Sequence, residues 1–420
     1  MLKIDNYTKL YTFLLVVAPI LNQYKIPGLN FIELIAIYGL AIIILKRPKI
    51  PKDRFLVYLF VGLITTIFST FILSMRIINF DFKFSLFVLR IIKYICVAFG
   101  IGIASKYYFN YSYAKKVYTF FVAFVSVGLF FQLIIHYLTG NNVFLIIPGL
   151  ILNYNDGINS SELIKLSTSK IIQGYYFRPS SIFLEPAYYS LYILPWISCY
   201  LNDANIKFKR IVYALIVTIG CVLTTSSLGI LGCVIIWLCF FVLYIKKKQF
   251  NTNSLLLLFL LIFVCCLCIV FLLRTEGIST SIAIKIGSLH SLNSASSTSV
   301  RLLRGWMFYD KLDFISKIIG LGYGNLSLFY HATGMNLIYD LNLTETSYMC
   351  GFATIINSFG MVGIFLYFRW LFNILKKSST TTRMLSVVLC IILFTSDCYD
   401  SAFYWMIYAL ITSGYKYYDC

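Results

Sequence analysis

Stretches of about 20 apolar residues recur along the whole 420-residue chain, and they limit its possible folds more than any other feature. Of all residues, 60% are hydrophobic and only 12% are charged. A bilayer core offers no hydrogen-bond partner to an exposed backbone, so an apolar segment of this length crosses it as a helix. The pattern predicts an all-α, polytopic membrane protein with about 12 transmembrane helices, forming a single integral membrane domain over residues 1–420. The expected spans are 10–24, 28–45, 55–73, 84–103, 117–138, 182–201, 211–227, 229–245, 254–273, 346–368, 384–396 and 401–415.

The net charge of +19 follows the membrane topology rather than indicating nucleic-acid binding. Lysine and arginine concentrate in short connections on one side, such as KRPKIPKDR at 46–54 and KKK at 246–248. Such connections lie in the cytoplasm by the positive-inside rule. We therefore expect both termini inside and no nucleic-acid partner.

Two long polar segments, residues 153–181 and 274–345, interrupt the apolar series. The predicted orientation places both outside the membrane. The first belongs to an outer loop over 139–181, whose apolar run from Val143 to Leu152 is too short to cross and is interpreted as re-entrant or interfacial. The second, 274–345, forms the larger outer loop.

Helical periodicity within the larger loop predicts an amphipathic helix from Val300 to Ile315, lying at the outer interface. At about 100° per residue, its basic side chains share one face. Arg301, Arg304 and Lys311 form that face, while Leu302, Leu303, Trp306, Leu312 and Ile315 form the apolar side.

A glycine-rich string, Gly320-Leu-Gly322-Tyr-Gly324-Asn325, follows this helix. It resembles part of a dinucleotide-binding fingerprint, but no strand–helix–strand context surrounds it. We interpret it as a turn that reverses the chain near the membrane.

Arg178 and Glu185 frame the entry to the sixth span, in the segment RPSSIFLEP. Glu185 is expected about one helical turn inside the span, where an ionisable residue is costly and usually functional or paired. One interpretation is an Arg178–Glu185 ion pair that fixes the helix end. The other is an outward-facing site that uses both charges.

Arg301 and Arg304 present planar forks of donors that suit phosphate oxygens. They could contact anionic lipid headgroups. Alternatively, they could hold a diphosphate together with Arg178. The spacing alone leaves both open.

His331 is the candidate general base of the larger loop, because an imidazole titrates close to neutral pH. Arg90 and Lys93 lie within the fourth span, and Glu33 of the second span could pair with either of them. Such pairing would hold the helices together; a transport pathway is the alternative.

Several motifs are absent from the sequence. It has no P-loop and no Asp-x-Asp, and most of its twelve cysteines lie inside spans without zinc-site spacing. We therefore expect no metal, no cofactor and a reaction that proceeds without ATP.

Several features of the chain together resemble the O-antigen polymerase (Wzy) family, which is related to the O-antigen ligases. They are the many spans, the late outer loop, RPSSIFLEPAYYSL at 178–191, TTSSLGILG at 224–232, the GLGYGN turn, His331 and Gly360-Met-Val-Gly363. The architecture agrees over most of the chain. The motif likeness is confined to islands near 178–190, 224–232 and 300–363.

The resemblance implies a membrane-embedded, metal-independent glycosyltransferase of lipopolysaccharide biosynthesis. Its substrate would be an undecaprenyl-diphosphate-linked oligosaccharide, polymerised at the periplasmic face of the bacterial inner membrane. A chain-length regulator protein and membrane lipids would be its partners. By this likeness His331 acts as the base toward the acceptor hydroxyl, with Glu185 as the alternative base or an orienting residue. Arg178, Arg301 and Arg304 would hold the diphosphate.

Two other functions fit the same sequence. An O-antigen ligase would use the same donor with a lipid A–core acceptor. A flippase or transporter would move the lipid-linked glycan without forming a glycosidic bond, and predicts charges along a central cavity.

Overall fold

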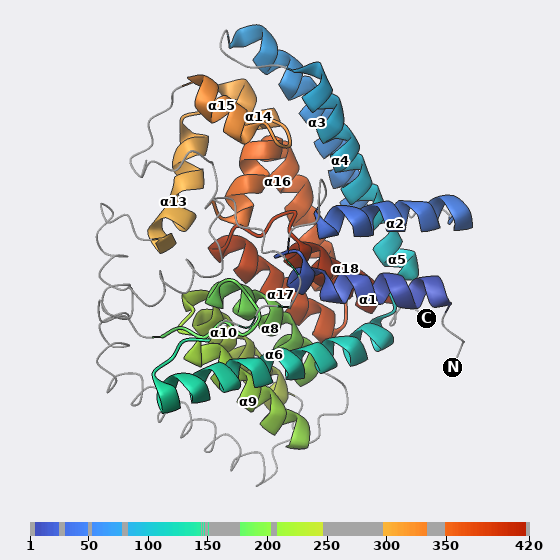
Figure 1. Ribbon diagram of the computed structural model, residues 1–420. Helices are drawn as coiled ribbons and strands as arrows, with labels where there is room; N and C mark the ends of the chain where they lie inside the picture. Colours follow the sequence, from blue (N-terminus) through green and yellow to red (C-terminus); the bar gives the residue numbers. More distant parts are fainter. Residues whose placement is uncertain are drawn as a thin grey trace. The chain divides into compact units, whose positions relative to one another are not determined.

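The computed structural model of the protein describes residues 5–24, 30–48, 53–77, 83–143, 145, 147, 150, 177–202, 208–246, 297–333 and 349–416 (Figure 1). Within these ranges the secondary structure is helical and contains no β-strand, which confirms the predicted all-α class. The helices are α1 (Asn6–Leu21), α2 (Phe31–Lys46), α3 (Arg54–Arg76), α4 (Phe84–Gly102), α5 (Ala104–Tyr108), α6 (Tyr111–Thr139), α8 (Pro186–Leu201), α9 (Phe208–Leu223), α10 (Ser227–Lys246), α13 (Ser297–Asp310), α14 (Phe314–Ile319), α15 (Leu326–Thr333), α16 (Gly351–Lys377), α17 (Thr380–Thr395) and α18 (Ala402–Lys416).

Helices occupy every predicted span that falls within the described ranges, and the span predicted at 254–273 lies outside them. In the described part of the chain, four helical segments are long and apolar enough to cross a membrane: Arg54–Arg76, Phe84–Tyr108, Tyr111–Thr139 and Gly351–Lys377. Shorter apolar helices cover Asn6–Leu21, Ser227–Leu243, Thr380–Thr395 and Ala402–Gly414. The chain therefore has the character of a membrane-embedded protein.

The chain divides into two compact units. Unit 1 comprises Met1–Asn22, Ile26–Val117 and Asn293–Cys420. Unit 2 comprises Gln23–Lys25 and Tyr118–Leu292.

Small residues let two helices of unit 1 approach closely. A Cβ on Gly39 of α2 would collide with the carbonyl oxygen of Gly100 in α4, and a Cβ on Gly100 would collide with that of Ala36. Small side chains allow such backbone contact between helices in a membrane, where burial from water no longer drives association. This contact fixes α2 against α4.

Helix α16 is interrupted at Gly360, whose φ of 67° and ψ of −168° are not helical. The interruption frees backbone carbonyls that the next helical turn would otherwise bind. The turn after α14 satisfies them, because Leu321 N–H donates to Asn357 O and Gly322 N–H to Ser358 O, both at 2.8 Å. Figure 1 shows α14 beside α16. A broken membrane helix is tolerated where protein groups satisfy its backbone in this way.

An aromatic cluster forms the core between α3, α16 and α18. The ring of Phe55 lies 4.6 Å from that of Trp370 and 4.3 Å from that of Tyr408. Tyr58 lies 5.3 Å from Tyr367. Offset and edge-on pairs of this kind add to the energy of apolar burial.

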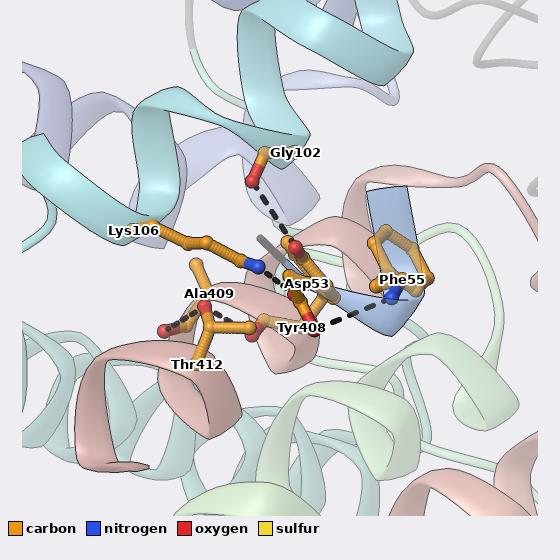
Figure 2. Close-up of polar contacts among 7 residues, drawn as sticks. All are labelled: Asp53, Phe55, Gly102, Lys106, Tyr408, Ala409 and Thr412. Carbon is orange, nitrogen blue, oxygen red and sulfur yellow. Dashed lines mark hydrogen bonds and ion pairs between the residues drawn. The ribbon is translucent and has the colours of Figure 1, made fainter. Parts of the chain in front are cut away.

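An ion pair with little solvent exposure joins α5 to the start of α3 (Figure 2). Lys106 of α5 pairs with Asp53, which also caps α3 by accepting the Phe55 N–H at 3.3 Å. Nearby, the Tyr408 hydroxyl donates to Gly102 O at 3.1 Å. A carboxylate that serves as both cap and ion-pair partner satisfies two otherwise costly groups.

Unit 2 packs α9 and α10 against α8. From Tyr189 to Leu201, nearly every residue of α8 is buried. The Trp196 indole of this helix donates to Thr119 Oγ1 of α6 at 3.1 Å. We therefore regard α8 as the central helix of unit 2.

The helix predicted over 300–315 is two helices, and its predicted faces are wrong in part, since Leu312 is buried as predicted but Arg304 is buried too. Helix α13 ends at Asp310, and α14 begins at Phe314. The buried stripe is Arg304, Phe308 and Leu312, which are 0%, 0% and 4% exposed. Trp306 and Ile315, assigned to the apolar side, are 36% and 39% exposed. The reason lies outside the helix: Asn357 Nδ2 of α16 donates to Gly305 O at 2.8 Å, which holds this stripe against α16.

Candidate functional site

Arg178 is an exposed side chain held against the connection between α9 and α10. Its Nε donates to Thr225 Oγ1 at 3.0 Å and to Thr224 O at 3.3 Å, and its Nη2 to Thr225 O at 3.5 Å. Thr225 adopts a left-handed φ of 51°, which is uncommon for a β-branched residue. Hydrogen bonds to Thr224 and Thr225 therefore hold the Arg178 guanidinium group against the strained connection between α9 and α10.

Two buried amides fix the segment that follows Arg178. Gln132 Oε1 of α6 accepts from Ser181 N–H at 2.7 Å, and its Nε2 donates to Ser181 O at 3.0 Å. Gln23 Oε1 accepts the Leu184 N–H at 2.6 Å. Both glutamine side chains are at most 6% exposed. The non-helical stretch before α8 is thus rigidly supported rather than a free loop.

Glu185 is the N-cap residue of α8, with Pro186 at the first helical position. It therefore lies at the helix entrance and not one turn inside it, as the hydropathy pattern suggested. Proline fits this position because its missing N–H would have no helical partner there. The Glu185 side chain is half-buried.

Arg304 is fully buried in unit 1, whereas Lys311, predicted to share its face, is exposed. The backbone of Arg301 belongs to α13, and its side chain lies outside the described part of the chain. His331 is exposed in the last turn of α15, with its ring 5.6 Å from that of Tyr330. Arg178 and Glu185 thus belong to unit 2, whereas Arg304 and His331 belong to unit 1.

The GLGYGN string is a turn, as predicted, with φ of 79°, 88° and 74° at Gly320, Gly322 and Gly324. It is also a binding surface for side chains of two helices. Asn325 Nδ2 donates to Thr70 Oγ1 at 2.7 Å, and Asn325 Oδ1 accepts from Arg90 Nη1 at 2.9 Å. The turn therefore joins α3 to α4.

Lys93 forms the ion pair with Glu33, its Nζ 2.6 Å from Oε1. This confirms that Glu33 pairs with one of the two cations of α4. Arg90, the other candidate, binds Asn325 instead. Glu33 additionally accepts from its own N-cap residue, because Asn30 N–H donates to Glu33 Oε2 at 3.1 Å.

Asp400, which the sequence analysis did not single out, lies in the connection between α17 and α18. Its Oδ1 accepts from the Trp405 indole at 2.8 Å, and its Oδ2 accepts from the Tyr323 hydroxyl of the glycine turn. Burial raises the pKa of the Asp400 carboxyl above its usual range, while these hydrogen bonds and the charge of Lys93 act the other way. An acidic residue between two apolar runs was the signal that could have revealed it.

No group of three or more histidine, cysteine or acidic side chains that could hold a metal ion occurs among the residues that the structure describes. No protein-family model matches the chain, and no curated protein matches it either. The function must therefore be argued from the chain itself.

Proposed function

We propose that the protein is a glycosyltransferase that polymerises lipid-diphosphate-linked oligosaccharide repeats of a bacterial surface polysaccharide. One observation carries this proposal: the sequence islands on which the polymerase resemblance rests pack against one another. In unit 2, Arg178 binds Thr224 and Thr225 at the start of the TTSSLGILG island. A Cβ on Gly229 of the same island would collide with Ser190 Oγ.

In unit 1 two parts of the 300–363 island meet. The GLGYGN turn donates two backbone hydrogen bonds to Asn357 and Ser358, which precede the Gly360-Met-Val-Gly363 motif. Segments that are far apart in sequence thus form joint structures in both units. This arrangement is what a shared architecture would require, and it supports the resemblance.

The chemistry assigned to these residues follows from general principles. The bond from an anomeric carbon to a diphosphate is already activated, so the transfer needs no ATP. Fixed cations lower the barrier by meeting the charge that develops on the leaving group. Arg178 is exposed and positioned for this role, and His331 is exposed for the role of base. Arg304 is buried, so a contact with the diphosphate would require α13 to move away from α16.

The proposal is tested by supplying the purified protein in lipid nanodiscs with undecaprenyl-diphosphate-linked repeat units. A ladder of longer glycolipids is expected. His331→Ala should abolish the ladder, whereas His136→Gln, a change to the histidine that stacks on Phe177, should not, provided that both variants remain folded. Absence of a ladder with folded protein and the correct repeat would refute polymerisation. Labelling of a lipid A–core acceptor would instead identify a ligase.

Transport of the same lipid-linked glycan is the second candidate, and the charged side chains of Arg90, Lys93 and Glu33 favour it. Charges within membrane helices commonly mark substrate pathways. Movement of labelled glycolipid across vesicles without any new glycosidic bond would select this function.

A further inference from the structure

Arg90 is a charged side chain within a membrane-spanning helix that has no carboxylate partner among the described residues. Within the described ranges its hydrogen bond is to an amide oxygen, because Arg90 Nη1 donates to Asn325 Oδ1 at 2.9 Å. The neighbouring cation, Lys93, already neutralises Glu33. A half-buried guanidinium without a counter-ion is costly at membrane depth, so an anion from outside the chain is the natural partner.

The glycine turn holds this guanidinium in a fixed orientation. Asn325 is 1% exposed, and its Nδ2 binds Thr70 Oγ1 at 2.7 Å and Leu321 O at 2.9 Å. Its amide is therefore locked with the oxygen directed at Arg90. A bond through a single nitrogen leaves the remaining donors of the planar fork available, and such a fork suits phosphate oxygens.

Gly324 contributes a backbone donor beside the guanidinium. It is exposed, has a φ of 74°, and its N–H donates to no atom within the described ranges. A Cβ at this position would lie 3.2 Å from Arg90 Cδ and 3.6 Å from Nε. Glycine thus permits the close approach of backbone and guanidinium, and turns with left-handed residues that expose N–H groups are common anion sites.

The surroundings of Arg90 indicate that the anion belongs to a lipid. Arg90 lies seven residues after the N-cap Lys83, so it is about 10 Å along the helix axis from the start of α4. Leu86, Leu89 and Ile92 on the same helix are 44%, 61% and 51% exposed. In a bilayer these side chains face acyl or polyprenyl chains, which brings a lipid headgroup within reach of Arg90.

We propose that Arg90, positioned by Asn325, and Gly324 form a binding site for a terminal phosphate or diphosphate group carried by a lipid. If the proposed function is correct, the natural ligand of this site is the lipid-diphosphate-linked glycan; the identity of the lipid therefore rests on that function. It would hold the headgroup in unit 1, independently of Arg178 in unit 2.

Binding of farnesyl diphosphate to the full-length protein in nanodiscs tests this proposal. Arg90→Gln is expected to weaken binding about tenfold or more, since charge-assisted hydrogen bonds are lost. Arg76→Gln is the matched control, because Arg76 ends the neighbouring helix α3 and already pairs with Asp313 at 3.1 Å. Its affinity should stay within about twofold of the wild type. Equal affinities of wild type and Arg90→Gln would overturn the proposal.

Two further variants test the proposal if Arg90→Gln does not fold. Arg90→Lys keeps the charge but lacks the fork, and should weaken binding by a smaller factor. Gly324→Ala keeps the charge and the fork of Arg90 but places a Cβ 3.2 Å from Arg90 Cδ, and should weaken binding as well. If both bind as the wild type does, the site is refuted.

Two other probes distinguish the source of the phosphate. Inorganic pyrophosphate should compete weakly, and phosphatidylglycerol nanodiscs should not mimic the saturable, Arg90-dependent signal. Arg90-dependent binding of pyrophosphate with the affinity of the lipid would refute a lipid ligand. Polymerisation is scored separately. Arg90-dependent binding without a glycan ladder would uphold this site and refute the polymerase, and a ladder with Arg90-independent binding would do the reverse.

Discussion

Gly360 of α16 and Ile318 of α14 approach so closely that a Cβ on Gly360 would collide with the Ile318 carbonyl oxygen and lie 2.6 Å from Gly320 N. The contact occurs where α16 loses its helical geometry. The break and the turn that fills it are thus one structural unit.

Gly360→Ala should therefore destabilise the protein by several kcal/mol, because it combines a left-handed φ with a backbone collision. Thermal unfolding in detergent measures the change. Gly140→Ala is a matched control: Gly140 has a φ of 70° but open space around its Cβ position. It should cost only about 1 kcal/mol. Equal losses at the two positions would show that the collision does not matter.

The Glu33–Lys93 ion pair should contribute a measurable coupling energy. Glu33 and Lys93 side chains are 15% and 40% exposed, so the pair lies between a surface pair and a buried one. We expect a coupling of about 1 kcal/mol in a double-mutant cycle of Glu33→Gln and Lys93→Met. The cycle is measured by unfolding in detergent. Strict additivity of the two single losses would show that the pair contributes nothing.

The raised pKa of Asp400 predicts a specific pH dependence. The folded state keeps the proton to higher pH than the unfolded state does, so stability falls as pH rises from the ordinary carboxyl range through the folded pKa. Asp400→Asn removes this loss. The variant should melt a few degrees above the wild type at pH 7, and the difference should vanish at acidic pH.

A wild type that is less stable than Asp400→Asn at low pH as well would contradict the linkage.

Asn357 should be essential for the docking of α13. Its Nδ2 binds Gly305 O and Ala353 O, both at 2.8 Å, from a fully buried position. Asn357→Leu keeps the volume but removes both bonds, and should cost about 1–3 kcal/mol. Hydrogen exchange should accelerate in α13 before it does in α8. Unchanged protection of α13 would show that apolar contacts alone hold the helix.

The sequence predicted the helical class well, because long apolar runs leave a membrane protein few alternatives. It also predicted the glycine turn and the pairing of Glu33 with a cation of α4. These are local properties or consequences of an unpaired charge. The tertiary contacts of these features could not be predicted in the same way. Hydropathy does not show that the glycine turn packs beside Gly360.

The errors arose where tertiary contacts override a local pattern. A helical wheel predicts that Arg304 is an exposed cation. In the structure, the hydrogen bond from Asn357 to Gly305 O holds this face of α13 against α16. Glu185 was placed inside the sixth span because apolar residues precede it, whereas Pro186 sets the actual start of α8. Asp400 was overlooked because one of its partners, Tyr323, lies 77 residues away in the sequence.

The shared space of Gly320 and Gly360 has an evolutionary consequence. Neither position can accept a larger residue while the other segment keeps its path, so the two sites should vary together among related chains or not at all. A lineage that lost one glycine would have to rebuild the turn and the helix break in concert. Paired substitutions at these positions would therefore mark the branches on which this end of unit 1 acquired a different architecture.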